Sequence, residues 1–146
     1  MAGSKQVTIN QSFYDKMDKL RDGAKEKAWT KGEEVVSYAV AISPVWTGAY
    51  VESFSVRARG NSSGRMRKSQ YNPDSPESVN RELKKSPSEV AALKESEAAR
   101  LREEVRSIDP LEQNGFTLRN RAPHAQLVED KLGHAVFRRT KARFSG

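Results

Sequence analysis

The sequence predicts an α+β domain in which a small antiparallel β-sheet is packed by a long N-terminal helix and a second helix, with a long basic loop. Three observations lead to this fold class. An apolar stripe with helical spacing runs over residues 13–42, a helix-start signal lies at residues 86–89, and short alternating segments follow both helical stretches. A length of 146 residues suits a single domain, residues 1–146.

The first element is predicted to be a long helix over about residues 12–42. Asn10 or Ser12 serves as its N-cap, and Pro44 ends it, because proline disfavours helical geometry in the residue before it. The stripe breaks just before Gly32, which leaves open a kink or a break there. About thirty helical residues span roughly 45 Å, so one end is expected to project towards a neighbour. The stripe comprises Phe13, Met17, Leu20, Ala24, Ala28, Val35, Ala39 and Ile42.

A turn and a strand follow the first helix. Thr47 and Gly48 indicate the turn, and alternation from Tyr50 onward favours a strand, with a helical turn before it left open. Residues 59–76 are rich in Gly, Ser, Asn, Pro and Arg, so they are expected to form an exposed basic loop.

The second helix, over about residues 87–108, has the clearest start signal. Ser86 at N-cap, Pro87 at N1 and Glu89 at N3 form a capping box, and Asp109-Pro110 ends the helix. Its apolar side is expected to be core. The alternative, a face for a partner helix, would make the protein a helical adaptor that dimerises through residues 77–110. That side comprises Val90, Leu93, Leu101, Val105 and Ile108.

The remaining elements are predicted to be short. Phe116 and Leu118 alternate with polar residues and indicate a strand. Pro123 is expected to start a short helix that ends at Gly133, and residues 134–144 are expected to form a closing strand with a basic outer face.

The charge is unevenly distributed along the chain. The formal net charge is +7 and the isoelectric point is about 9.8, which favours anionic partners. Two stretches carry cations without acids, and we expect the parts from Arg57 to Lys68 and from Arg138 to Arg143 to contact acidic neighbours or DNA. The first contains Arg57, Arg59, Arg65, Arg67 and Lys68, and the second contains Lys131, Arg138, Arg139, Lys141 and Arg143.

The polar residues around both histidines do not form a complete catalytic or metal site. His124 and His134 lack the spacing of a zinc-binding pair on one helical face, no G-x-S-x-G motif occurs, and the adjacent acids Glu129 and Asp130 diverge. The chain has 0 cysteines, so thiolate chemistry is excluded. We therefore predict no enzyme activity, no catalytic residue, no metal and no cofactor.

The sequence also bears on membrane association and nucleic-acid binding. No apolar run has the length of a membrane span, so no membrane partner is expected, and synthesis in the cytoplasm is the default. Nucleic-acid binding is favoured by the first basic stretch, but the chain lacks a helix-turn-helix, zinc-finger or ribonucleoprotein signature. A small basic protein that binds nucleic acid non-specifically therefore remains the alternative.

Two stretches together resemble a known family. "ISPVWTGAYVESFSV" is similar to the P-x-x-T-G-x-x-x-x-S signature of the tail-completion (neck, head–tail joining) proteins of tailed bacteriophages. "NGFTLRNRAPHAQLVEDKLGH" is similar to that family's second signature, a strand ending in Asn, then A-P-Tyr-A, an apolar residue, Glu and Gly. His124 stands in place of the tyrosine, and "DKL" separates Glu129 from Gly133. The matching frame comprises Pro44, Thr47, Gly48, Ser53, Asn120, Pro123, His124, Glu129 and Gly133.

The resemblance implies a non-enzymatic virion protein. Its subunits would form a six- or twelve-fold ring at the neck, between the portal or adaptor and the tail proteins, around the DNA channel. Within this frame Asn120 is expected to close its strand with a side-chain hydrogen bond, and Pro123 to set a turn. Glu129 is expected to pair with an arginine of this subunit or the next.

Overall fold

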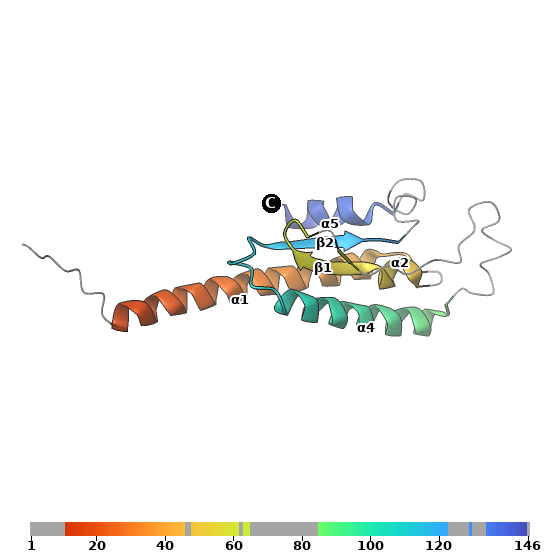
Figure 1. Cartoon of the computed structure of the whole chain (residues 1–146). Coiled ribbons are helices and arrows are strands. Elements are labelled where there is room, and N and C mark those ends of the chain that lie inside the picture. Colours follow the sequence, from red (N-terminus) through yellow and green to blue (C-terminus); the bar gives the residue numbers. More distant parts are fainter. Residues whose placement is uncertain are drawn as a thin grey trace, which may run out of the picture.

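The fold is described by a computed structural model that covers residues 11–45, 48–61, 63–64, 85–122, 129 and 134–145 (Figure 1). It is an α+β fold, as the sequence predicts, in which helices pack on a two-stranded antiparallel sheet. The elements are α1 (Gln11–Ile42), α2 (Ala49–Glu52), β1 (Phe54–Ala58), α4 (Pro87–Arg106), β2 (Phe116–Asn120) and α5 (Val136–Phe144).

Strands β1 and β2 pair from Phe54 opposite Asn120 to Ala58 opposite Phe116. Because side chains alternate across a strand, this register turns Phe54 and Val56 towards the helices, where both are buried. Arg119, which pairs with Ser55, lies on the other face and is exposed. The sheet thus has one apolar face and one polar face.

Helix α1 contacts both α4 and α5 and is the longest element. Its C-terminal half packs in the body, whereas its N-terminal half extends beyond it (Figure 1). All the described side chains of residues 11–24 are exposed. The expected projecting end is therefore the N-terminal one.

The core lies where the helices meet the sheet. Its apolar stripe from α4 includes Leu101 and Val105, which are both fully buried, so the interpretation of this stripe as core is confirmed. The other fully buried apolar residues come from α1, the α2 turn, β1 and α5. The largest of them are Val36, Val40, Val51, Phe54, Val56 and Val136.

The capping box that was expected at the start of α4 is present. Ser86 Oγ accepts a hydrogen bond from the Glu89 backbone N–H at 3.3 Å, and the Glu89 carboxylate accepts one from the Ser86 N–H at 3.1 Å. These bonds satisfy two N–H groups that have no intrahelical partner.

The structure decides two points that the sequence leaves open in the first part of the chain. Helix α1 runs through Gly32 without a break. A Cβ at this position would lie 2.9 Å from the Val105 side chain and 3.2 Å from the Phe116 ring. Gly32 therefore allows close packing rather than a break. Residues 49–52 form the helical turn α2, so the strand begins only at Phe54.

The closing strand expected over residues 134–144 is wrong, because Val136–Phe144 is helix α5. Its buried residues Val136 and Thr140 are four apart, which is helical spacing. The Thr140 hydroxyl also donates a hydrogen bond to the Val136 carbonyl at 2.7 Å. The short helix that was expected from Pro123 to Gly133 lies outside the described residues, apart from Glu129.

Candidate interaction surfaces

The two motif stretches meet at Tyr50. The Asn120 amide donates a hydrogen bond to the Tyr50 carbonyl at 2.8 Å, although the residues are 70 apart in the sequence. Its side-chain oxygen accepts the Ala122 N–H at 2.9 Å. The prediction that Asn120 closes its strand with a side-chain hydrogen bond is confirmed. Burial raises the pKa of Tyr50, and the nearby Glu129 carboxylate adds a smaller effect in the same direction.

Gly48 and Ser53 flank the turn α2. Gly48 has a φ of 95°, which is left-handed, and a Cβ there would lie 2.8 Å from the Leu93 side chain and 2.9 Å from Lys85. Only glycine suits both conditions. The buried Ser53 hydroxyl donates to the Ala49 carbonyl at 2.7 Å and closes the turn. These residues have structural roles.

Pro44 follows the end of α1, where the buried Ser43 hydroxyl donates to the Ala39 carbonyl at 2.6 Å. The remaining predicted frame residues cannot be placed, because they lie outside the described residues. They are Thr47, Pro123, His124 and Gly133.

Glu129 caps the N-terminus of α5. Its two carboxylate oxygens accept the backbone N–H groups of Phe137 at 3.1 Å and Arg138 at 3.0 Å. An acid at this end also complements the helix dipole. The sequence signal for this role was missed because α5 was not expected to be a helix. Pairing of Glu129 with an arginine side chain stays a prediction.

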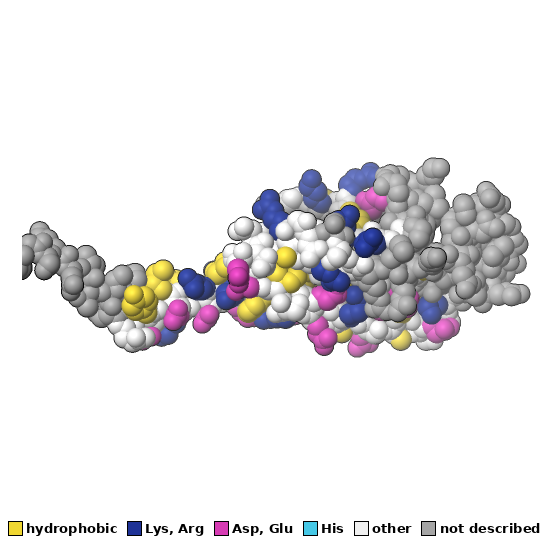
Figure 2. Space-filling model, in the orientation of Figure 1, with side chains coloured by type: hydrophobic (Ala, Val, Ile, Leu, Met, Phe, Trp, Pro, Cys, Tyr) yellow, Lys and Arg dark blue, Asp and Glu magenta, His cyan; other side chains and the backbone are white. Residues whose placement is uncertain are grey.

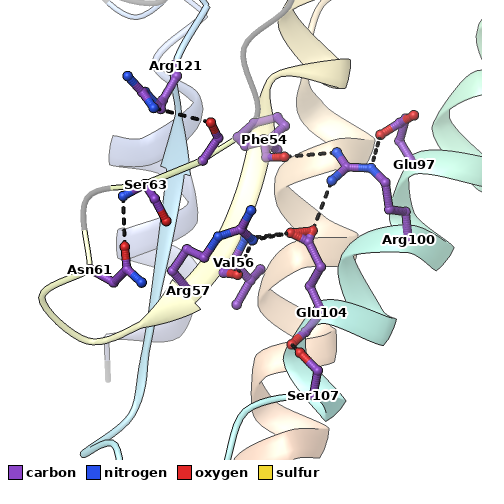
Figure 3. A network of polar contacts seen from close by, with 11 residues as sticks. Phe54, Val56, Arg57, Asn61, Ser63, Glu97, Arg100, Glu104, Ser107 and Arg121 are labelled. Carbon is purple, nitrogen blue, oxygen red and sulfur yellow. Dashed lines mark hydrogen bonds and ion pairs between the residues drawn. The ribbon is translucent and has the colours of Figure 1, made fainter.

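Arg57, which was predicted as a partner contact, joins an internal network between β1 and α4 (Figure 3). Its guanidinium lies 2.7 Å from the Glu104 carboxylate, which also accepts the Val56 N–H at 3.3 Å. Arg100 bonds Glu104 at 2.9 Å and donates to the Phe54 carbonyl at 2.9 Å. Side chains of α4 therefore satisfy backbone groups at the edge of β1 that does not face β2.

The rest of the first basic stretch is only partly placed. Arg59 is exposed beside the turn at Gly60. Arg65, Arg67 and Lys68 lie outside the described residues, so their expected contacts with a partner or DNA stay predictions.

The second basic stretch forms an exposed face on α5. This helix carries four cationic residues and no acidic one. The whole set is exposed, and Figure 2 shows dark blue side chains along this side of the body. The set, named here the α5 basic face, comprises Arg138, Arg139, Lys141 and Arg143.

The projecting half of α1 carries three large exposed apolar side chains, which we call the α1 tip. Tyr14, Met17 and Leu20 are 51%, 45% and 71% exposed. Met17 and Leu20 belong to the predicted stripe, but sequence periodicity could not tell that the body ends before them. Figure 2 shows apolar side chains on this end of the helix.

An apolar groove of about 480 Å³ lies where α1 enters the body. Its lining includes Ala28 and Val35 of α1, Phe116 and Leu118 of β2, and Pro110 of the turn before β2. Its single charged lining residue is Lys31. This composition suits an apolar protein side chain better than a charged substrate.

The described residues show no arrangement for metal binding, since no group of three or more His, Cys, Asp or Glu residues among them lies close enough to hold an ion. Within the same residues, no helix has the length and hydropathy required to cross a membrane.

Comparisons with known proteins give no further assignment, because no family model, curated protein or solved structure matches this chain.

Proposed function

We propose that this protein is a structural subunit of the bacteriophage neck, which assembles into a ring joining the portal or adaptor of the head to the tail. The proposal rests on the resemblance of two sequence stretches to the signatures of tail-completion proteins. The observation that carries it furthest is the hydrogen bond from Asn120 to the Tyr50 carbonyl. It supports treating the two stretches as one folded joint rather than as two chance matches.

The shape of the chain supports a role in assembly. The α1 tip exposes Tyr14, Met17 and Leu20, whereas comparable residues of the body are largely buried. A helix that presents apolar side chains beyond its own body gains stability when a neighbouring subunit covers them. Repeating such a contact between one surface and a different surface generates a ring when the rotation closes.

In this proposal the frame residues hold the fold rather than perform chemistry. Gly48 and Ser53 fix the turn after α1, and Asn120 fixes β2 to that turn. Glu129 fixes the start of α5. The ring would have six- or twelve-fold symmetry around the DNA channel, in contact with portal or adaptor and tail proteins.

The experiment that tests this function is a pull-down of the tagged protein from its source cells, with and without nuclease, followed by mass spectrometry. Recovery of a few stoichiometric partners after nuclease treatment is expected for a neck subunit. Release of all partners by nuclease would contradict the proposal.

The second candidate is a small basic protein that binds nucleic acid non-specifically. The α5 basic face favours it, because four exposed cations without an acid suit phosphate contacts. It gives no role to the apolar α1 tip, so we place it second. The nuclease arm of the pull-down separates the two candidates.

A further inference from the structure

We infer that the α5 basic face binds the phosphate backbone of duplex DNA without reading its sequence. This inference rests on the proposed function in taking DNA as the relevant polyanion and deepens it by naming the face that DNA contacts. It starts from the distribution of charge on the folded chain.

Among the described residues, four other cations of the body are engaged by acids. Arg106 bonds Glu26 at 2.9 Å and Glu33 at 2.6 Å. Lys25 bonds Asp109 at 2.9 Å. Arg57 and Arg100 are held in the network around Glu104. Within each pair the opposite charges cancel, so these cations contribute little to the electrostatic potential outside the molecule.

The α5 basic face differs from these pairs. Among the residues that the structure describes, Arg139, Lys141 and Arg143 form no ion pair, and each is exposed. The only acid described at this helix, Glu129, accepts backbone N–H groups at its N-terminal end. The positive charge of these three residues is therefore available to an anionic partner.

Packing fixes which side of α5 faces outward. Val136 and Thr140 are buried. The Phe144 ring lies edge-on to Tyr38 of α1 with centroids 5.7 Å apart, and Phe137 lies 5.9 Å from the Phe54 ring. These contacts anchor the helix on both sides of its apolar stripe. Arg139 and Lys141 are exposed, and Arg143, also exposed, lies 6.0 Å from the centre of the Tyr38 ring.

The same packing favours duplex DNA over single strands. Proteins that bind single strands combine cations with aromatic side chains on which bases stack. Both aromatic residues of α5 already pack against other rings, Phe137 against the buried Phe54 and Phe144 against Tyr38, so neither ring is free as a stacking platform. Lysine and arginine side chains without a stacking aromatic residue can still contact phosphates. Phosphate contacts carry no sequence information.

The test measures how salt weakens the binding of the full-length protein to a short duplex of mixed sequence by fluorescence anisotropy. The variant Arg139→Gln/Lys141→Gln/Arg143→Gln removes three cations from the face. Each lost phosphate contact lowers the slope of log affinity against log salt by about 0.9, so we expect the slope to fall by about 2 to 3 between about 50 and about 200 mM salt.

A matched control removes the same charge elsewhere. Lys16, Lys19 and Lys27 are exposed lysines of α1, and their triple change to Gln should leave the slope close to that of the wild type. The charge-preserving variant Arg139→Lys/Arg143→Lys should retain the wild-type slope, because lysine also neutralises phosphate. Circular dichroism of each variant checks that α5 remains folded.

An equal fall of the slope in the α5 variant and in the lysine control would overturn the inference, because DNA affinity would then depend on the total charge of the protein and not on the α5 basic face. Absence of salt-dependent duplex binding by the wild type would also overturn the inference. In that case, recovery of neck partners in the pull-down would still support the proposed function. Binding lost only in the α5 variant, with no neck partners recovered, would support this inference and reject the neck.

Discussion

Asn120 shows at the scale of a single residue how two distant parts of the chain are joined. Its side chain both donates to the Tyr50 carbonyl and accepts the Ala122 N–H, so it satisfies backbone groups on two segments. Asparagine suits this position because its side chain offers a donor and an acceptor. This role was expected from the resemblance to the second tail-completion signature, in which a strand ends in Asn.

Replacing Asn120 with alanine should lower the free energy of unfolding by about 1 to 3 kcal/mol, because the Tyr50 carbonyl and the Ala122 N–H would lose their partner. Urea denaturation measures this change. Asn61→Ala is the matched control, because the one hydrogen bond of the Asn61 side chain within the described part of the chain is to the exposed Ser63 N–H. We expect a change within about 0.5 kcal/mol. Equal effects of both substitutions would show that Asn120 is not a joint.

The ion pair between Lys25 and Asp109 predicts a dependence of stability on pH. The Lys25 ammonium holds the pKa of Asp109 below its ordinary value of 3.8. A carboxyl group whose pKa is lowered by folding stabilises the fold above its unfolded pKa. That contribution is lost as the pH falls from about 3.8 through the lower folded value.

The variant Lys25→Gln should therefore show a weaker decline of the urea midpoint below about pH 4 than the wild type. Lys27→Gln is the control, because Lys27 is exposed and has no ion pair among the described residues. Identical pH profiles for Lys25→Gln and the wild type would show that the pair does not contribute to stability.

Gly32 and Gly23 show at the scale of an element why α1 has two different halves. Gly32 lies where α1 packs closely on α4 and β2, whereas a Cβ at Gly23 would meet nothing within 4 Å. The same residue type thus permits close packing in one half of the helix and only lowers helix propensity in the other.

Gly23→Ala should raise the helical signal in circular dichroism, because alanine favours the helix by up to about 1 kcal/mol relative to glycine. Gly32→Ala carries the same propensity gain, but its Cβ forces apart the buried Val105 and the partly buried Phe116 side chains, and overpacking costs about 1 to 3 kcal/mol. We expect Gly32→Ala to lower the urea midpoint. A higher midpoint for Gly32→Ala would contradict the packing described here.

The elements that could be predicted have long patterns or strong local signals. The stripe of α1 and the capping box of α4 span enough residues to define a helical period. Helix α5 has nine residues, and its few apolar positions fit a strand as well as a helix when taken alone. Its helical state depends on packing against Tyr38 and Phe54 and on the Glu129 cap, none of which is local in the sequence.

The basic residues of the candidate surfaces could be predicted from the sequence, but their arrangement could not. The basic residues of the C-terminal segment were identified, but their concentration on one helical face depends on the structure of α5. Arg57 was assigned to partners because its acidic neighbour Glu104 lies 47 residues away in the sequence and is brought close only by the fold.

Across the whole chain, the body and the α1 tip differ in how far their apolar side chains are buried. The body buries most of its large apolar residues, with Leu111 an exposed exception among those described, whereas the tip exposes Tyr14, Met17 and Leu20. The neck proposal explains this difference, because a neighbouring subunit would cover the tip in a ring.

Replacing Met17 and Leu20 with serine should reduce assembly without unfolding the subunit, because both side chains are exposed and leave no cavity. Urea denaturation of the isolated variant checks its stability. Leu111→Ser is the matched control, because Leu111 is also exposed, at 44%, but lies on the turn after α4. Assembly that is unaffected by changes at the tip would remove α1 from the proposed contact.

The most direct test of the neck proposal is negative-stain microscopy of the nuclease-treated complexes recovered with the tagged wild-type protein. We predict closed rings, alone or at the junction of head and tail, that are lost with the Met17→Ser/Leu20→Ser variant. Complexes that contain no ring and no particle in the wild-type sample would contradict the proposal.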